Sequence, residues 1–236
     1  IKFGFVQIGN QHWSTWIHDA VRKCGEYEMM VDIHDEYRPT GFSRTYPNLM
    51  TQEGIRGNEE MPDATHNTIL PFTRFLAGAA DYTLCYFNGR VKNTKAHQLA
   101  MAGVYYSPLQ FMFWYDRPEF YKGEEELEFW KAIPSVWDDS RALDGEIGEY
   151  IIQARRSGND WFVGAMTNTE ARTVTVMTDF LEPGKKYTAH LYEDDDKLNT
   201  GTKVRTAHKK VKAGDKLILK LKASGGAALH FTPIEK

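Results

Sequence analysis

A strand, a helix and a second strand follow one another within the first 33 residues, and this order most constrains the fold. Ile1–Gln7 (IKFGFVQ) is an apolar run of strand type. Ser14–Tyr27 has apolar residues at helical spacing, and Gly25 marks its end. Met29–Ile33 (MMVDI) is again strand-like. Strands joined through a helix run parallel, so the pattern predicts a βαβ unit.

Strand-like and helix-like segments keep alternating up to about residue 135. Two apolar runs, Tyr82–Phe87 (YTLCYF) and Leu109–Trp114 (LQFMFW), have the character of buried strands. Between them, Lys95–Tyr106 has the apolar spacing of a helix, and Ser107-Pro108 ends it. The first part of the chain is therefore predicted to be α/β.

From about Asp144 the pattern changes to short alternating runs, separated by turn clusters roughly every 8–12 residues, as in a β-sandwich. Glu182-Pro183-Gly184 and Ala213-Gly214-Asp215 are predicted to be hairpin turns. We place the boundary between 135 and 145. The prediction is an α/β domain at residues 1–140 and an antiparallel all-β domain at residues 141–236.

Composition limits the classes of function. The chain has 236 residues and is 42% apolar, which is enough for a sizeable core. Its net charge of −3 argues against a nucleic-acid partner. No run approaches the roughly 20 apolar residues of a membrane span. Cys24 and Cys85 fit neither a disulfide framework nor a metal-ligand spacing, so we expect buried thiols. The chain starts with Ile1 in a strand pattern, so we expect natural sequence upstream of it.

The loop after Met29–Ile33 carries the residues best suited to catalysis. His34-Asp35-Glu36 follows the predicted strand directly, and in α/β barrels the carboxyl ends of the strands form the active site. Carboxylates there activate water, protonate a leaving group or bind a hard cation. A solvated loop is the plainer alternative. Ordered loops this long are uncommon unless they are functional.

Glu53 and Glu59 form a second group of carboxylates further along this loop. Gly54 and Gly57 allow the backbone between them to turn sharply and to bring both side chains to one site. Neighbouring carboxylates raise one another's pKa unless a cation is present, and a raised pKa suits a general acid. Their oxygens also suit Ca²⁺. We expect Glu60 to face outward.

Other side chains of this region have both a structural and a functional interpretation. The arginines at 38, 44 and 56 are predicted to offset the carboxylates and to order the loop, with substrate contact as the alternative. His66 either caps or packs a helix, or binds a ligand. Three aromatic residues are candidates for stacking on a sugar ring, although aromatics this numerous are mostly core: Trp13, Tyr46 and Trp137.

The combination RPTG…RTYPN…E-x-x-x-G-x-E…LPFTR resembles glycoside hydrolase family 97, and AHQLAMAGVYYSPLQF and PSVWDDSRALDGEIGEY extend the resemblance over nearly the whole chain. Members of this family are bacterial α-glucosidases and α-galactosidases. They have an N-terminal β-supersandwich, a central (β/α)₈ barrel and a C-terminal β domain. The resemblance implies that residues 1–140 are the second half of a TIM-type barrel and that residues 141–236 are the C-terminal β-sandwich. It also implies a periplasmic or secreted location, and a missing N-terminal half of the enzyme that completes the site.

The resemblance implies roles for individual residues. Glu59 matches the general acid that protonates the glycosidic oxygen and also contacts calcium, and Glu53 matches a calcium ligand. Asp35 matches the carboxylate that serves inverting members as base and metal ligand, with Glu36 as the fallback. His34 matches a substrate contact.

Gly4 distinguishes between the two mechanisms of the family. Retaining members have an Asp nucleophile in a run like IKVDFM, whereas this chain has IKFGFV with Gly4 at that position. Glycine cannot attack a sugar, so the resemblance implies inversion, with carboxylates about 6.5–9.5 Å apart. A second base and a further calcium ligand of the family would lie outside this chain.

We therefore predict an inverting, Ca²⁺-dependent α-glucosidase that acts on α-glucans or maltooligosaccharides. One alternative is a retaining α-galactosidase of the same family. The other is a carbohydrate-binding fragment without catalytic activity. The sugar, the linkage and the identity of the base, Asp35 or Glu36, stay open at this point.

Overall fold

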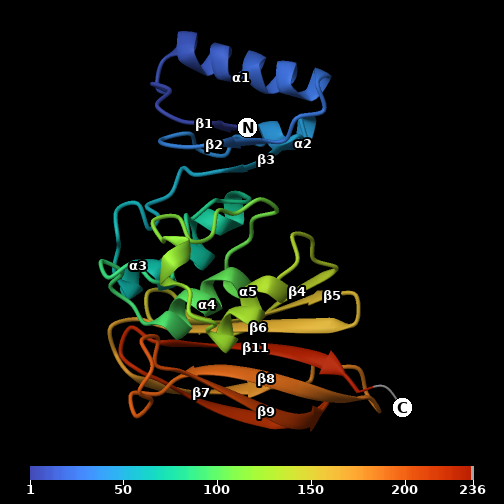
Figure 1. The fold of residues 1–236 in the computed structure, drawn as a ribbon. Coiled ribbons are helices and arrows are strands. Elements are labelled where there is room, and N and C mark those ends of the chain that lie inside the picture. Colours follow the sequence, from blue (N-terminus) through green and yellow to red (C-terminus); the bar gives the residue numbers. More distant parts are fainter. Residues whose placement is uncertain (235–236) are drawn as a thin grey trace.

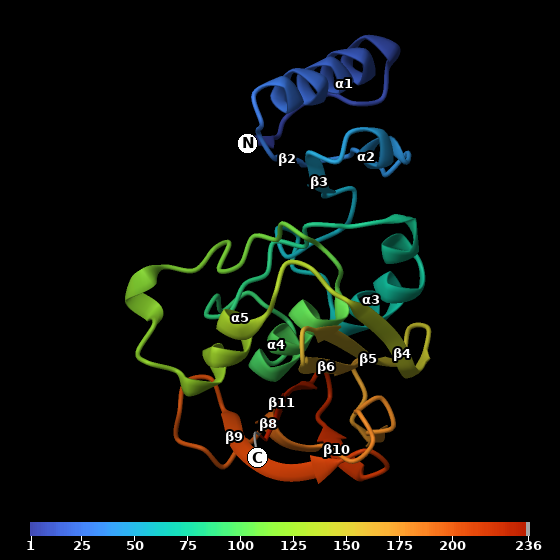
Figure 2. The same ribbon diagram turned by 90° about the vertical axis from the view of Figure 1, so that its right-hand side faces the viewer.

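The computed structural model of the chain describes residues 1–234, which form three tiers along one axis (Figures 1 and 2). A small parallel sheet with one long helix lies at one end. Short helices and irregular segments form the middle tier. Antiparallel sheets form the other end and contain most of the strands.

The first tier confirms the predicted βαβ unit. Strands β1 and β2 are parallel, and β3 pairs with β2 in parallel to give the sheet order β1-β2-β3. The Asn10 side chain accepts a hydrogen bond from the backbone of Trp13 and so caps the covering helix. The elements are β1 (Lys2–Phe3), α1 (Gln11–Glu26), β2 (Val31–Ile33), α2 (Phe42–Thr45) and β3 (Leu49–Gln52).

The middle tier is built around one buried helix, α4, which confirms the helix predicted from residue 95. Thr94 caps it, and every residue from Ala96 to Val104 is buried. No helix in residues 1–234 is both long enough and apolar enough to cross a membrane. The elements are α3 (Ala64–Ile69), η1 (Leu70–Phe72), η2 (Arg74–Ala77), α4 (Lys95–Val104), η3 (Pro118–Phe120), η4 (Glu125–Leu127) and α5 (Glu128–Ala132).

The predictions of regular strands at 82–87 and 109–114 are wrong. These segments share a single parallel bridge, between Leu84 and Met112. Two carboxylates divert the backbone from a ladder. Asp81 accepts hydrogen bonds from the amides of residues 83 and 111, and Asp116 accepts them from the amides of residues 86 and 87. An amide bonded to a side chain is not available to a neighbouring strand.

The third tier confirms the predicted antiparallel β domain. A six-stranded sheet has the order β4-β5-β6-β11-β8-β9, and β10 pairs with β7 in a two-stranded sheet; every pairing is antiparallel. The strands are β4 (Asp139–Glu146), β5 (Tyr150–Ser157), β6 (Asp160–Thr167), β7 (Arg172–Met177), β8 (Lys186–Asp194), β9 (Val204–Lys212), β10 (Lys216–Leu221) and β11 (Gly226–Pro233).

The two predicted hairpin turns are turns, but they do not connect paired strands. The chain around Glu182-Pro183-Gly184 leaves β7 in the small sheet and enters β8 in the large one. Ala213-Gly214-Asp215 makes the reverse passage, from β9 to β10. Turn residues mark where a chain reverses, but they do not specify which strand it pairs with next.

One apolar cluster lies between the large sheet and α4, and another lies between the two sheets. The first cluster joins Leu99 and Met101 of α4 to Phe162 and Met166 of β6. This cluster therefore joins residues on both sides of the segment 135–145, where the sequence pattern changes from α/β to all-β. Strand β4 begins at Asp139, and the domain boundary at residue 140 stays a prediction.

Candidate active site

Two parallel neighbouring strands bring the candidate residues to one edge of the small sheet. Ile33, the last residue of β2, lies opposite Gln52, the last residue of β3. The next residues are therefore neighbours, and the amide of Glu53 donates to the carbonyl of Ile33 over 2.7 Å. His34 and Glu53 thus occupy the carboxyl edge of the sheet, where α/β folds place ligands.

His34 lies at the centre of a buried group of carboxylates. Its Nε2 is 2.7 Å from Oδ2 of Asp81 and 3.1 Å from Oδ2 of Asp32, and its Nδ1 is 3.3 Å from Oε2 of Glu53. All four side chains are buried. Asp81 could not be predicted as a partner of His34, because 47 residues separate the two. Asp32 lies only two residues before His34, so the alternation of side chains along a strand places both on one face.

Burial and charge oppose each other at His34. Burial lowers the pKa of this imidazole, but the carboxylates of Asp32 and Asp81 outweigh that effect and raise the pKa to about 10. His34 is therefore a cation at neutral pH. Burial also raises the pKa of Asp32 to about 6 and that of Glu53 to about 7. In the absence of a metal ion, Glu53 thus titrates near neutrality.

The loop between the two glutamates has the shape that its glycines predicted. Gly54 has a φ of +43°, and a side chain at this position would clash with the carbonyl oxygen of Tyr37. A ligand atom of His34, one of Glu53 and one of Glu59 all lie within 4.8 Å of one another. The expectation that both glutamates come to one place is therefore confirmed.

Arg74, part of the LPFTR segment, holds this loop in place. Its guanidinium donates to the carbonyl oxygens of Gln52, Glu53 and Gly54 at 3.0–3.1 Å, and also to those of Gly78 and Ala79. Burial lowers the pKa of Arg74 to about 10. This role could not be predicted from the sequence, because all five acceptors belong to the backbone.

Asp35 is tied to the same centre, whereas Glu36 is not. The amide of Asp35 donates to Oε2 of Glu53 over 2.6 Å, and its carboxylate accepts a hydrogen bond from the amide of Phe5. A Cβ atom added to Gly4 would lie 3.7 Å from Oδ2 of Asp35. The Asp35 carboxylate thus lies beside the place where a side chain at position 4 would begin. Glu36 is exposed.

A hollow of about 560 Å³ opens onto these carboxylates. The exposed pair of Arg56 and Glu60 stands at its rim, with Nε and Oε2 2.8 Å apart, so Glu60 faces outward as predicted. Arg38 also lines the hollow, whereas Arg44 lies on α2. The lining residues are Asp35, Glu36, Arg38, Glu53, Gly54, Ile55, Arg56, Gly57, Glu59 and Glu60.

The side chains at the hollow could supply some of the oxygen ligands of a hard cation. Glu53, Glu59 and Asp35 offer carboxylate oxygens, the ligands that Ca²⁺ prefers, and Ca²⁺ takes six to eight of them. The raised pKa of Glu53 reflects a buried carboxylate that a cation would stabilise in its charged form. The remaining ligands would come from water or from groups outside this chain.

Other residues proposed from the sequence lie away from this centre. His66 is in the first turn of α3, where its Nε2 is 3.2 Å from the carbonyl oxygen of Arg56. Each of the three candidate stacking residues packs against another aromatic ring or an arginine: Trp13, Tyr46 and Trp137. The indole near the centre is that of Trp114, whose ring lies 5.8 Å from that of His34.

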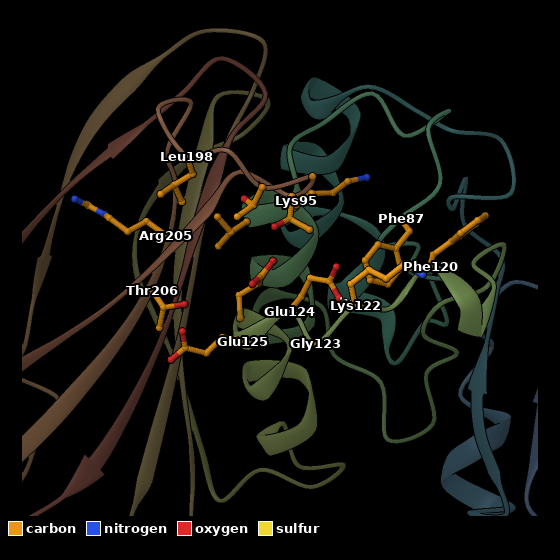
Figure 3. Close-up of a pocket in the computed structure, with 15 residues that line it drawn as sticks. Phe87, Lys95, Phe120, Lys122, Gly123, Glu124, Glu125, Leu198, Arg205 and Thr206 are labelled. Carbon is orange, nitrogen blue, oxygen red and sulfur yellow. Dashed lines mark hydrogen bonds between the residues drawn. The ribbon is translucent and has the colours of Figure 1, made fainter.

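A larger hollow, of about 840 Å³, lies between the middle tier and the β8–β9 connection (Figure 3). Lys95, Glu124, Glu125 and Arg205 line it, and Phe120 stands at one side. None of the clustered carboxylates around His34 belongs to it. Size alone therefore does not identify the site, and the concentration of buried titratable groups does.

Comparison with known proteins shows which proteins this chain is similar to. The family model described as Glycoside hydrolase 97 matches residues 1–55, and that described as Glycosyl-hydrolase 97 C-terminal, oligomerisation, matches residues 136–232. A protein of Bacteroides thetaiotaomicron named "Retaining alpha-galactosidase" is 33% identical over 98% of this chain and 38% of its own length. A protein of Streptomyces bingchenggensis named "Probable retaining alpha-galactosidase" is 31% identical over 75% of this chain and 28% of its own length.

Solved structures give the same result. A glycoside hydrolase family 97 enzyme from Pseudoalteromonas sp. strain K8, in complex with acarbose, superposes with a TM-score of 0.85 at 35% identity. The match covers 94% of this chain and 37% of that enzyme, and a variant of the enzyme was solved with panose. The present chain thus spans less than two fifths of the length of these relatives. Models of one family match both ends of the chain, and members of that family are 33–35% identical to it over 94–98% of its length. The chain therefore belongs to glycoside hydrolase family 97.

Proposed function

We propose that this chain carries the acid and base machinery of an inverting α-glucosidase that cleaves terminal α-glucosidic bonds of α-glucans or maltooligosaccharides. The observation that carries the proposal is the pairing of Gly4 with Asp35. Position 4 has no side chain to attack a sugar, and the carboxylate nearest to it belongs to Asp35 instead. An inverting enzyme needs such a carboxylate to activate water.

Glu59 is proposed as the general acid. It is only partly buried, lines the hollow and approaches Glu53 and His34 closely. In the reaction, Glu59 gives its proton to the glycosidic oxygen as the bond to the anomeric carbon breaks. Asp35, or Glu36 at the rim, takes a proton from the water whose oxygen forms the new bond. One proton is donated and one is accepted, so the exchange balances.

Glu53, Glu59 and Asp35 are proposed to hold a Ca²⁺ ion. Bound there, the cation would offset the negative charge of the carboxylates and so keep Glu53 ionised. In the metal-free chain, His34 supplies the positive charge beside Asp32 and Asp81. A direct contact of His34 or His66 with the sugar stays a prediction, since only 1% of His34 is exposed.

The substrate class rests on similarity. The Pseudoalteromonas enzyme was solved with acarbose and with panose, both of which are oligosaccharides or mimics of them. We propose that the three parallel strands here belong to the second half of a (β/α)₈ barrel, which residues outside this chain complete. A periplasmic or secreted location is proposed on the family resemblance alone.

A retaining α-galactosidase is the second candidate, because the Bacteroides and Streptomyces relatives carry that name. Gly4 opposes it for the reason given above. The third candidate is a fragment that binds carbohydrate without hydrolysis. Sugar binding without turnover, by the enzyme that contains this chain, would favour this third candidate over both hydrolases.

The acid assignment is tested by Glu59→Gln in the complete enzyme. Loss of the proton donor should lower kcat by about 100-fold or more on substrates with poor leaving groups, and much less on substrates with activated ones. Glu60→Gln is the matched control, because this exposed neighbour pairs with Arg56 and should keep near-native activity. Near-native turnover by Glu59→Gln would remove the assignment.

The metal assignment is tested by chelation. Activity should fall on removal of Ca²⁺ and return when Ca²⁺ is added back. A Glu53→Gln enzyme should need a higher Ca²⁺ concentration for half-maximal activity, because one carboxylate ligand is lost. Full activity in the chelator would contradict the calcium site.

A further inference from the structure

Three histidines form a row across neighbouring strands of the large sheet. His230 of β11 lies opposite His190 of β8, and His190 lies opposite His208 of β9. Residues directly opposite one another place their side chains on the same face of a sheet. The ring centroids are 5.8 Å apart for His230 and His190, and 4.6 Å apart for His190 and His208.

The row lies on the face of the sheet that is turned away from the sandwich core. Ala189 and Leu191, on either side of His190 in sequence, belong to the apolar cluster between the two sheets. Side chains alternate along a strand, so His190 points to the other face. Strands β8 and β9 are at the far end of the molecule from β2 and β3 (Figure 1), and the row is thus separate from the carboxylate site.

The rings are held in a definite arrangement. His230 stacks on Phe162 with centroids 4.3 Å apart, and its Nε2 is 2.8 Å from Oδ2 of Asp160. His190 is half-buried beside it, whereas His208 is exposed at the edge strand. Burial, followed by the neighbouring imidazoles of His208 and His230, lowers the pKa of His190.

We propose that His190 and His208 form a binding site for a divalent first-row transition metal of the Ni²⁺, Cu²⁺ and Zn²⁺ group. Neutral imidazole is a ligand that these ions favour, whereas Ca²⁺ and Mg²⁺ favour oxygen. Two imidazoles on one tetrahedral Zn²⁺, with Zn–N bonds of about 2.0–2.1 Å, have ring centroids about 5 Å apart. The separation of His190 and His208 is close to this value, and water would complete the coordination.

Charged side chains of both signs lie near the row of histidines. Lys210 is two residues from His208 on the same strand face, and its charge opposes a bound cation. Asp160 provides a compensating negative charge at the other end of the row, on His230. If the three rings meet only as packing partners, the chain will show no selective affinity for these metals.

The test is calorimetric titration of the full chain with Zn²⁺ in excess Ca²⁺, which occupies oxygen-rich sites. We expect Zn²⁺ to bind with one site, and His190→Ala and His208→Ala each to weaken it by about tenfold or more, the loss typical of a damaged metal shell. His12→Ala is the matched control, since His12 is exposed on α1 and far from the row, and it should bind Zn²⁺ as the native chain does.

A spectroscopic measurement keeps the proposal testable if a variant unfolds. Cu²⁺ bound to the native chain should show nitrogen hyperfine structure from two imidazoles in electron paramagnetic resonance. Unchanged Zn²⁺ affinity in a folded His190→Ala/His208→Ala chain would overturn the proposal. So would a Cu²⁺ spectrum with oxygen ligands only.

Discussion

His34 concentrates the electrostatics of the site in one residue. It carries a proton because Asp32 and Asp81 border one edge of its ring, and it presents its other nitrogen to Glu53. The sequence identified the motif residues His34, Glu53 and Glu59, whose types and spacing are chemical signals. It did not identify Asp81 as a partner of His34, because that contact depends on how distant segments meet. The contact with Asp32 follows from the two-residue spacing along the strand, a signal that was available but not used.

The proton on His34 makes the stability of the metal-free chain depend on pH. Its pKa is 6.5 without perturbation and about 10 in the fold. Above 6.5 the unfolded chain releases a proton that the folded chain keeps, so the free energy of unfolding falls as pH rises toward 10. Urea unfolding at pH 7 and pH 9 should show this loss. His34→Gln should reduce it, whereas His12→Gln should not, and an equal loss in both variants would contradict the account.

Arg74 stabilises the loop that carries Glu53, and lysine cannot replace it. A lysine ammonium has no planar fork to reach five carbonyl oxygens. Arg74→Lys should lower the free energy of unfolding by about 2–3 kcal/mol, since buried acceptors lose their charged donor. Arg44→Lys, at an exposed position of α2, should change it by less than about 0.5 kcal/mol. Equal effects in thermal unfolding would show that Arg74 has no special role.

At the scale of elements, the helices α1 and α4 could be predicted from the sequence, whereas the two strands predicted for the middle tier were wrong. The apolar spacing of α1 and α4 is intrinsic to the sequence, and so is the alternation of the β domain. The segments 82–87 and 109–114 have strand-like composition, but Asp81 and Asp116 bind their amides and leave one bridge. A local sequence pattern does not show that a side chain will bind a backbone amide in place of a neighbouring strand.

The C-terminal end of α4 depends on one buried residue of β5. Arg155 donates to the carbonyl oxygens of Gly103 at 3.0 Å and Val104 at 2.9 Å. A cation there also complements the helix dipole. Arg155→Met should therefore lower the free energy of unfolding by about 2–3 kcal/mol. Its neighbour Arg156 pairs with Asp138 at the surface, so Arg156→Met should cost less than about 1 kcal/mol. Chemical denaturation of both variants checks the contrast.

At the scale of the whole molecule, the three tiers differ in how much apolar surface they bury. The small parallel sheet and α1 share a modest cluster around Ile17, Val21 and Ile33. The two other clusters are larger and share the six-stranded sheet between them. The sequence predicted two domains from its change of pattern, but it could not show that α4 packs into the β domain, because that contact joins distant segments.

This imbalance predicts a gradient of local stability. Amides of β2 and β3 should exchange with solvent faster than those of β6 and β11, because fewer buried contacts oppose local opening. Hydrogen exchange followed by mass spectrometry on the isolated chain would reveal the order. Equal protection of the small parallel sheet and the six-stranded sheet would contradict this gradient, and would mean that the parallel sheet needs no further support from outside this chain.

The central claim is that Gly4 and Asp35 commit the enzyme to inversion. Proton NMR of the first product released from an α-glucoside, before mutarotation, tests it most directly in the complete enzyme. Inversion at an α-glucoside releases β-glucose as the first product. Release of the α-anomer would show net retention and would contradict the roles assigned to both residues.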